Sequence, residues 1–101
     1  MARSRFSFTA EVWEHEGPVA WHFVSLPEEV ADEIDATFGH QAKGFGSQRV
    51  EVTIGKTRWN TSIFPDRKRG TYLLPVKKEV RVSEQLAAGA SAAIDLTVID
   101  K

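Results

Sequence analysis

Cysteine is absent from the 101-residue chain. Its absence excludes disulfides, thiolate nucleophiles and cysteine-based zinc sites. The chain also lacks any apolar run near the roughly 20 residues that a membrane-spanning helix needs. Residues 1–8 carry two arginines but no apolar segment, so we expect no signal peptide. A disulfide-free domain suits a reducing compartment, and we expect a cytoplasmic location without membrane contact.

An excess of charge of either sign is missing as well. Thirteen basic and fourteen acidic residues give a net charge of -1. A dedicated nucleic-acid-binding domain usually carries a clear positive excess. The composition therefore argues against a purely electrostatic DNA binder, although it permits a local basic patch. Six Phe, three Trp and one Tyr are enough to anchor the packed core of one domain over residues 1–101.

The hydrophobic pattern predicts a mostly β domain. An apolar stripe at Leu26, Val30, Ile34 and Phe38 predicts one helix, which Ser25 and Glu28 would begin as a capping box. A second helix is predicted over residues 76–86. Alternating or β-branched segments predict strands over residues 6–13, 20–25, 48–54, 57–64, 71–74 and 92–99. Six short strands at close spacing with two short helices favour a small β-barrel.

Two local signals refine this topology. Gly55-Lys56 predicts a type II′ hairpin turn, which pairs residue 54 with 57 and places Trp59 over Val52 on the inner face. A strand that runs into Leu-Pro and then a helix occurs twice, at residues 26–27 and 74–75. This echo has two interpretations, which are chance and two similar halves that close one barrel.

Several segments together resemble a known family. They are FTAEVWE (residues 8–14), WHFV (21–24), LPEEV (26–30), VEVTIGKTRWNTSIFP (50–65), GTYLLPVK (70–77) and VR (80–81). The set is similar to a bacterial family of unknown function, domain of unknown function 1905. The resemblance implies a double-split β-barrel, an architecture shared with swapped-hairpin DNA-binding proteins. It implies no activity.

The outer face of the predicted hairpin is polar. One interpretation is a solvated sheet face on which Glu51 pairs diagonally with Arg58. The other is a platform on which two arginines and an amide hold a carboxylate or phosphate, because a guanidinium group binds such anions in a bidentate manner. The hypothesised ligand-binding residues on this face and the adjacent turn are Arg49, Glu51, Arg58, Asn60, Ser62, Asp66, Arg67 and Tyr72.

Basic residues are concentrated in the segment from Arg67 to Arg81. An exposed, solvated turn would explain them. Phosphate contacts in a dimeric nucleic-acid-binding protein are the alternative, with Asp66 and Glu79 diluting the positive charge. The residues of that alternative site are Arg67, Lys68, Arg69, Lys77, Lys78 and Arg81.

Four ring-bearing residues near the first predicted turn offer a further surface. Trp13, His15, Trp21 and His22 could line a pocket or stack a base or sugar. Packing is the competing interpretation, in which Trp21 and Phe23 share one strand face and His22 takes the other.

Catalytic and metal-binding patterns are not recognisable. The three histidines follow no HxH or HExxH spacing, so no metal or cofactor is expected. No nucleophile elbow is present and no catalytic residue is assigned. The sequence favours a non-enzymatic binding or interaction module for a small anionic ligand or a protein partner. Nucleic-acid binding and a small metabolite enzyme are the alternatives, and both a monomer and a homodimer fit the pattern.

Overall fold

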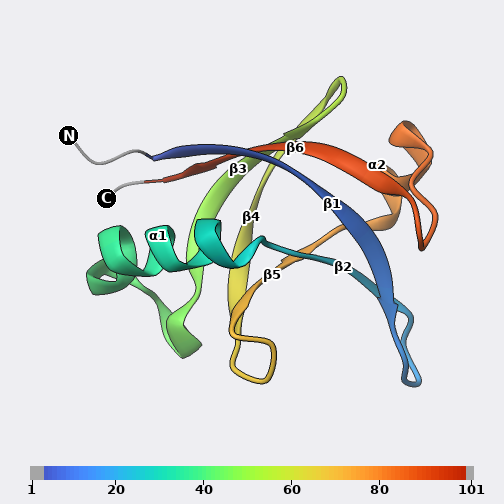
Figure 1. Ribbon diagram of the computed structural model, residues 1–101. Helices are drawn as coiled ribbons and strands as arrows, with labels where there is room; N and C mark the ends of the chain where they lie inside the picture. Colours follow the sequence, from blue (N-terminus) through green and yellow to red (C-terminus); the bar gives the residue numbers. More distant parts are fainter. Residues whose placement is uncertain (1–3, 100–101) are drawn as a thin grey trace.

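The chain forms a closed six-stranded antiparallel barrel with two α-helices (Figure 1). The computed structural model describes residues 4–99, except for the side chain of Phe45. Around the barrel the strands follow the order β1-β2-β5-β4-β3-β6. The elements are β1 (Arg5–His15), β2 (Trp21–Ser25), α1 (Glu28–Phe38), the 3₁₀ turns η1 (Gly39–Gln41) and η2 (Gly44–Gly46), β3 (Gln48–Ile54), β4 (Thr57–Asp66), β5 (Thr71–Pro75), α2 (Lys78–Glu84) and β6 (Ser91–Val98).

The predicted mostly β barrel is therefore confirmed. The hairpin register is confirmed too, because Ile54 pairs with Thr57 and Val52 with Trp59. Gly55 has a φ of 58°, which fits the first position of a type II′ turn. Within residues 4–99, no helix is long and apolar enough to cross a membrane.

Strands β1 and β4 are long because each belongs to two sheets. Residues 5–11 of β1 pair with β6, whereas residues 12–15 pair with β2. Residues 57–63 of β4 likewise pair with β3, and residues 64–66 pair with β5. The barrel thus has two four-stranded walls that share β1 and β4. We call them the β3–β6 sheet (β1-β6-β3-β4) and the β2–β5 sheet (β1-β2-β5-β4).

The chain repeats one order of elements. The first half runs β1-β2-α1-β3 and the second half runs β4-β5-α2-β6. The Leu26 N–H donates to the Tyr72 carbonyl at 3.0 Å, and the Val76 N–H donates to the His22 carbonyl at 2.9 Å. Each residue of one bond lies 50 positions from its counterpart in the other. The halves are thus related by an approximate two-fold axis between β2 and β5.

The two Leu-Pro dipeptides do not occupy equivalent positions in this repeat. Leu26-Pro27 and Leu74-Pro75 lie 48 positions apart in the sequence. The structural counterpart of Leu26-Pro27 is Val76-Lys77, which has no proline. The interpretation of two similar halves agrees with the structure, but the dipeptide that suggested it is displaced by two residues.

The hydrophobic core fills the barrel and extends beneath the helices, which lie on opposite sides of the barrel in Figure 1. Helix α1 buries Ala31, Ile34 and Phe38, and α2 buries Val80. The side-chain amide of Gln48 donates to the Phe38 carbonyl at 2.8 Å and so ties the end of α1 to β3. Half-buried Trp59 packs against the core, as the hairpin register predicts.

The two helix boundaries depart from the sequence prediction. The capping box is wrong, because α1 begins at Glu28 after Pro27 and no side chain caps it. The Ser25 hydroxyl instead accepts a hydrogen bond from Trp13 Nε1 at 3.0 Å. Helix α2 is shorter than the predicted range of residues 76–86, since it begins at Lys78 and Gln85 ends it by adopting a left-handed conformation.

Candidate functional site

The polar hairpin residues lie on the outer surface of the β3–β6 sheet. Arg49 pairs with Ser62 across the strands, and its Nη1 donates to the Ser62 hydroxyl at 3.2 Å. Exposed Asn60 faces Glu51 in register. Beside them is a shallow hollow of about 220 Å³. We call its lining the charged face, and it consists of Arg5, Glu51, Thr53, Arg58, Asp95 and Thr97.

Charges on the charged face largely balance one another. Asp95 Oδ2 lies 3.5 Å from Arg5 Nη2, and Asp95 Oδ1 accepts a hydrogen bond from the Ser7 hydroxyl. These contacts, the hydrogen bond from Ser7 above all, lower the pKa of Asp95. Among residues 4–99 no ion pair joins Glu51 to Arg58, so the predicted diagonal pair is absent. Two acids face two arginines around the hollow, which leaves no net charge to attract an anion.

Tyr72 lies elsewhere, on the inner side of β5. Only 6% of its surface is exposed, and its hydroxyl donates to Asp35 Oδ1 of α1 at 3.5 Å. Burial, and secondarily the charge of Asp35, raises the pKa of Tyr72. Its ring lines a cleft of about 350 Å³ between α1 and the β4–β5 turn, together with Asp66 and Arg67. The eight residues of the predicted anion site therefore do not converge on one surface.

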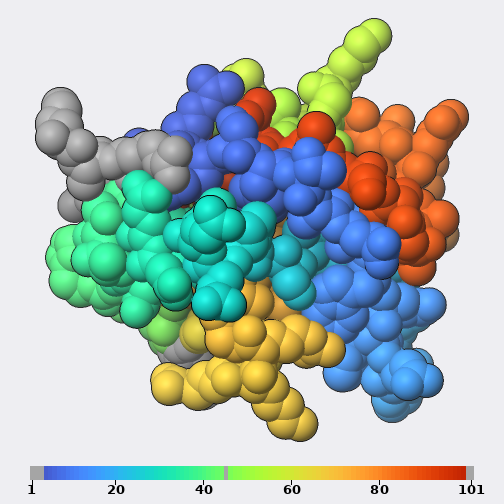
Figure 2. All heavy atoms as spheres, viewed as in Figure 1, coloured from blue at the N-terminus to red at the C-terminus, as the bar shows by residue number. Residues whose placement is uncertain are grey.

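A concavity of about 620 Å³, larger than the hollow and the cleft above, lies on the outer surface of the β2–β5 sheet. Figure 2 shows the two hairpins that flank it along the lower edge of the molecule, β1–β2 in blue and β4–β5 in yellow. We call it the aromatic groove. Its lining consists of Trp13, His15, Trp21, Phe23, Phe64, Pro65, Asp66, Arg67, Lys68, Arg69, Leu73 and Pro75.

Strand pairing explains why apolar side chains gather in the aromatic groove. Alternation along each strand turns the neighbours of buried Val12, Val24 and Leu74 outward. Register then places Trp13 beside Phe23 in one half of the chain, and Phe64 beside Leu73 in the other half. The approximate two-fold axis between β2 and β5 passes through this floor.

The aromatic rings of the groove are in mutual contact. The Trp13 and Phe23 ring centroids are 5.3 Å apart, and Trp21 stacks on Phe23 at 6.2 Å with an interplanar angle of 10°. Even so, 54% of Trp21 and 43% of Phe64 remain exposed. Large apolar side chains in a shared exposed patch are typical of ligand or partner sites.

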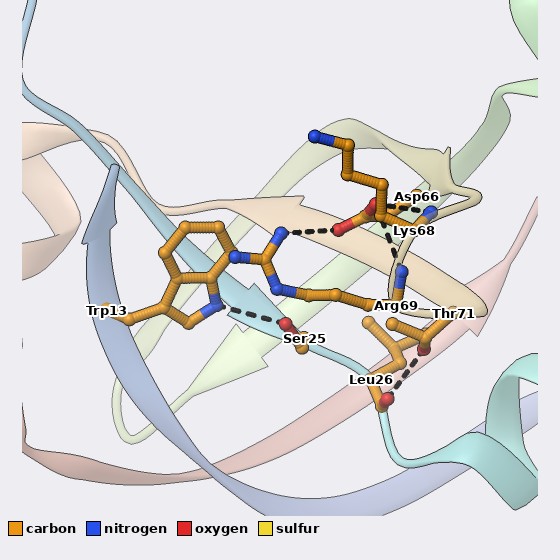
Figure 3. Close-up of polar contacts among 7 residues, drawn as sticks. All are labelled: Trp13, Ser25, Leu26, Asp66, Lys68, Arg69 and Thr71. Atoms are coloured by element: carbon orange, nitrogen blue, oxygen red, sulfur yellow. Dashed lines mark hydrogen bonds and ion pairs between the residues drawn. The ribbon is translucent and has the colours of Figure 1, made fainter. Parts of the chain in front are cut away.

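Arg69 carries a fixed cation over this aromatic floor (Figure 3). Its guanidinium carbon lies 4.4 Å from the centroid of the Trp13 ring. Arg69 Nη1 contacts Asp66 Oδ2 at 2.7 Å, and this hydrogen bond is the main reason why the pKa of Asp66 lies below 3.8. The hydrogen bond from Trp13 Nε1 to Ser25 holds the indole in turn. Both the ring and the cation are therefore positioned before any ligand arrives.

The Asp66 carboxylate also shapes the turn that carries the groove's other cations. Its Oδ1 accepts hydrogen bonds from the backbone N–H groups of Lys68 and Arg69, at 3.1 and 3.4 Å. Arg67 and Lys68 are exposed, and no partner among residues 4–99 engages their side chains. The aromatic groove thus presents three basic side chains against one carboxylate.

The remaining basic residues of the predicted nucleic-acid site lie at the other end of β5. Lys77 and Lys78 are exposed at the start of α2. Lys77 borders a small pocket that shares Trp21 and Pro75 with the aromatic groove. Arg81 has a structural contact, since its Nε donates to the Val76 carbonyl at 3.2 Å.

Sequence reasoning weighed the ring-bearing residues of the first hairpin but did not place the site there. Trp13, His15 and Trp21 line the aromatic groove, whereas His22 does not, which agrees with the packing interpretation for His22 alone. The His22 Nδ1 atom is buried and has no hydrogen-bond partner among the described residues. The site could not be located from the sequence because it depends on long-range strand pairing. Phe64 and Leu73 come from strands about 50 residues away from the first hairpin.

Metal ligands do not cluster in the described part of the chain, where no group of three or more acidic or histidine side chains could hold an ion. A family model described as "Domain of unknown function (DUF1905)" matches residues 8–96. No curated protein matches the chain.

Proposed function

Because the chain belongs to the DUF1905 family, which carries no assigned activity, we propose a function from geometry: the domain binds a small ligand that has a planar apolar body and an anionic group. The aromatic groove is the binding site. The observation that supports this most directly is the Arg69 guanidinium, which lies 4.4 Å above the Trp13 ring and is held there by Asp66. The role is binding and not catalysis, and the absence of cysteine suits a cytoplasmic location.

The floor of the groove supports recognition of the planar body. A flat ring laid against Trp21, Phe23 or Phe64 removes apolar surface from water and gains offset stacking contacts. The volume of about 620 Å³ is within the range of small-molecule sites. Because Ser25 already fixes the indole of Trp13, little side-chain entropy is lost on binding.

Arg69 supports recognition of the anionic group. Only its Nη1 is bonded within the described residues, so Nε and Nη2 keep N–H donors for a ligand. A guanidinium presents such donors in a planar fork that fits carboxylate and phosphate. Exposed Arg67 and Lys68 add positive potential at the same rim. The charged face has no comparable excess, and this contrast favours the aromatic groove as the anion site.

The test compares 1-naphthoate, neutral 1-naphthamide and acetate by amide NMR titration at pH 7. We expect naphthoate to shift residues of β1, β2, β5 and the β4–β5 turn, naphthamide to bind more weakly and acetate to leave the spectrum unchanged. Arg69→Gln should weaken naphthoate binding by about tenfold, which corresponds to one lost charge-assisted hydrogen bond.

Arg58→Gln is the matched control, because it removes an arginine from the charged face and leaves the groove intact. Naphthoate binding by this variant should equal that of the unmodified protein. Equal affinity of naphthoate and naphthamide would contradict the anion-binding role of Arg69. Shifts centred on Arg49 and Arg58 would transfer the site to the β3–β6 sheet.

A further inference from the structure

Exposed cations lie at both ends of β5, one group in the aromatic groove and one beyond it. Arg67 and Lys68 lie before this strand, and Lys77 and Lys78 lie after it. Five residues of extended chain span about 16 Å. A mononucleotide-sized ligand that binds Arg69 cannot also reach Lys77. A ligand that contacts both groups of cations must therefore carry several anionic groups along its length.

From this arrangement we infer that the ligand of the aromatic groove is a short stretch of single-stranded nucleic acid. The inference rests on the proposed function and names its ligand class. Bases stack on the exposed rings of Trp21 and Phe64, and phosphates contact the cations at the two ends of β5. Aromatic platforms combined with basic side chains are the usual means of binding single strands without sequence preference.

The position of the rings supports a multi-base ligand. Trp21 lies on β2 and Phe64 on β4, with β5 between them, so two exposed rings face the groove from opposite sides. Trp21 also lines the adjoining pocket that Lys77 borders, which makes the apolar floor continuous with the second basic end. A strand crossing this floor passes from one pair of cations to the other.

A duplex does not fit the same surface. Its bases are already stacked, so the exposed faces of Trp21 and Phe64 gain nothing from them. Helix α2 is also a poor recognition helix for a duplex. It has seven residues, and the side chain of its Arg81 is bonded to the Val76 carbonyl.

The experiment compares thymidine 5′-monophosphate, octathymidylate and an octameric duplex by NMR titration and by fluorescence anisotropy of labelled oligonucleotides. An octapeptide of alternating proline and glutamate provides an anionic polymer without bases. We expect octathymidylate to bind at least tenfold more tightly than the mononucleotide, the duplex and the peptide. Its affinity should fall with rising salt. The logarithm of the association constant, plotted against the logarithm of the salt concentration, should have a slope of about −0.7 for each phosphate contacted.

Three variants locate the binding. Trp21→Ala should weaken octathymidylate binding by about tenfold, as expected for one lost stacking contact. Lys77→Gln combined with Lys78→Gln should weaken octathymidylate binding about fivefold but leave mononucleotide binding unchanged. Arg49→Gln combined with Arg58→Gln removes two charges from the β3–β6 sheet and should change neither. Amide spectra of each variant check that the fold is intact.

The outcomes separate the two proposals. If naphthoate and mononucleotide bind at Arg69 but octathymidylate binds no more tightly, the inference is overturned and the proposed function stands. If the proline–glutamate peptide binds best, the ligand is a peptide and the inference is again overturned. If no anion binds in the groove, both proposals fail. Loss of octathymidylate binding in the Lys77 and Lys78 variant supports the inference.

Discussion

The two walls of the barrel follow the same rule of alternation and yet present opposite chemistry to solvent. Outside the β3–β6 sheet lie threonines, arginines and acids, as expected for an antiparallel sheet with one wet face. Outside the β2–β5 sheet lie Trp13, Phe23, Phe64 and Leu73. Each wall contains strands from both halves of the approximate two-fold repeat, so the repeat itself does not explain the difference.

Folding alone explains the outer surface of one wall but not that of the other. The charged face carries as many positive as negative groups and can remain solvated at little cost. The aromatic groove keeps Trp21 and Phe64 partly in water, and folding alone does not require large apolar side chains at such exposed positions. This contrast supports the proposal that the groove is the wall with a function, and four stability measurements test the difference between the two walls.

The largest expected effect concerns the inner sides of the two walls. Leu74 in the β2–β5 sheet and Leu96 in the β3–β6 sheet are both fully buried. Replacing either by Ala removes buried methyl groups and leaves a cavity, so each change should lower the free energy of unfolding by about 2–5 kcal/mol. Urea denaturation measures both.

Similar losses would show that the walls differ only on the outside. A small loss for Leu74→Ala beside a large one for Leu96→Ala would mean that the β2–β5 sheet is weakly coupled to the core. The aromatic groove would then not be preorganised, and ligand binding would cost more conformational entropy than proposed.

The next effect compares the two tight turns next to these walls. Gly55 and Gly70 have φ values of 58° and 67°, so alanine is strained at both. Space differs, because a Cβ at Gly55 would lie 2.0 Å from Glu84 Oε1, whereas nothing lies within 4 Å at Gly70. Gly70→Ala should therefore cost about 1 kcal/mol.

Gly55→Ala should cost about 2 kcal/mol, since Glu84 must also give up its 2.7 Å hydrogen bond from the Thr57 hydroxyl. Thermal unfolding of Gly55→Ala with and without Glu84→Ala separates strain from crowding. The extra loss should disappear when Glu84 is already removed. A persistent extra loss would show that crowding by Glu84 is not its cause.

The sequence predicted the fold closely because each strand carries its own local signal. Alternation in Phe6–Val12 and Val50–Ile54, together with the Gly55 turn, determined the sides and the register of the strands. The capping box failed for a long-range reason, since the Ser25 hydroxyl is used by Trp13, twelve residues away. Local spacing contains no information about such competition.

The candidate site was less predictable than the fold. Arg49, Arg58 and Arg67 are near one another in the sequence, but Tyr72 turns inward and Arg58 faces Glu51 and Asp95. The aromatic groove requires the pairing of β2 with β5, which joins segments 50 residues apart. A sequence read in order identifies the rings of each hairpin and does not show that they meet.

A smaller effect concerns the turn that holds Arg69. The pKa of Asp66 is lowered below 3.8, so its carboxylate stabilises the folded state above that pH and loses this contribution as the pH falls through the folded pKa. Asp66→Asn should lose about 0.5–1 kcal/mol at pH 7, the value of one well-formed surface pair. Asn retains an oxygen for the backbone N–H groups of the turn.

Melting temperatures from pH 7 to pH 2 test this dependence. The gap between Asp66→Asn and the unmodified protein should narrow as the pH falls below 3.8, and it should close once the pH has passed through the lower pKa of Asp66 in the folded state. A gap that stays constant would assign the loss to altered turn geometry and not to the Arg69 pair.

The smallest expected effect is on the charged face. Arg58 is exposed and forms no ion pair with Glu51 among the described residues. Arg58→Gln should change the free energy of unfolding by no more than about 0.5 kcal/mol, and salt should affect both proteins alike. Urea denaturation at low and high salt provides the measurement. A loss above 1 kcal/mol at low salt would make this face a stabilising charge network with a structural purpose of its own. The contrast between a functional wall and a merely solvated wall would then have to be abandoned.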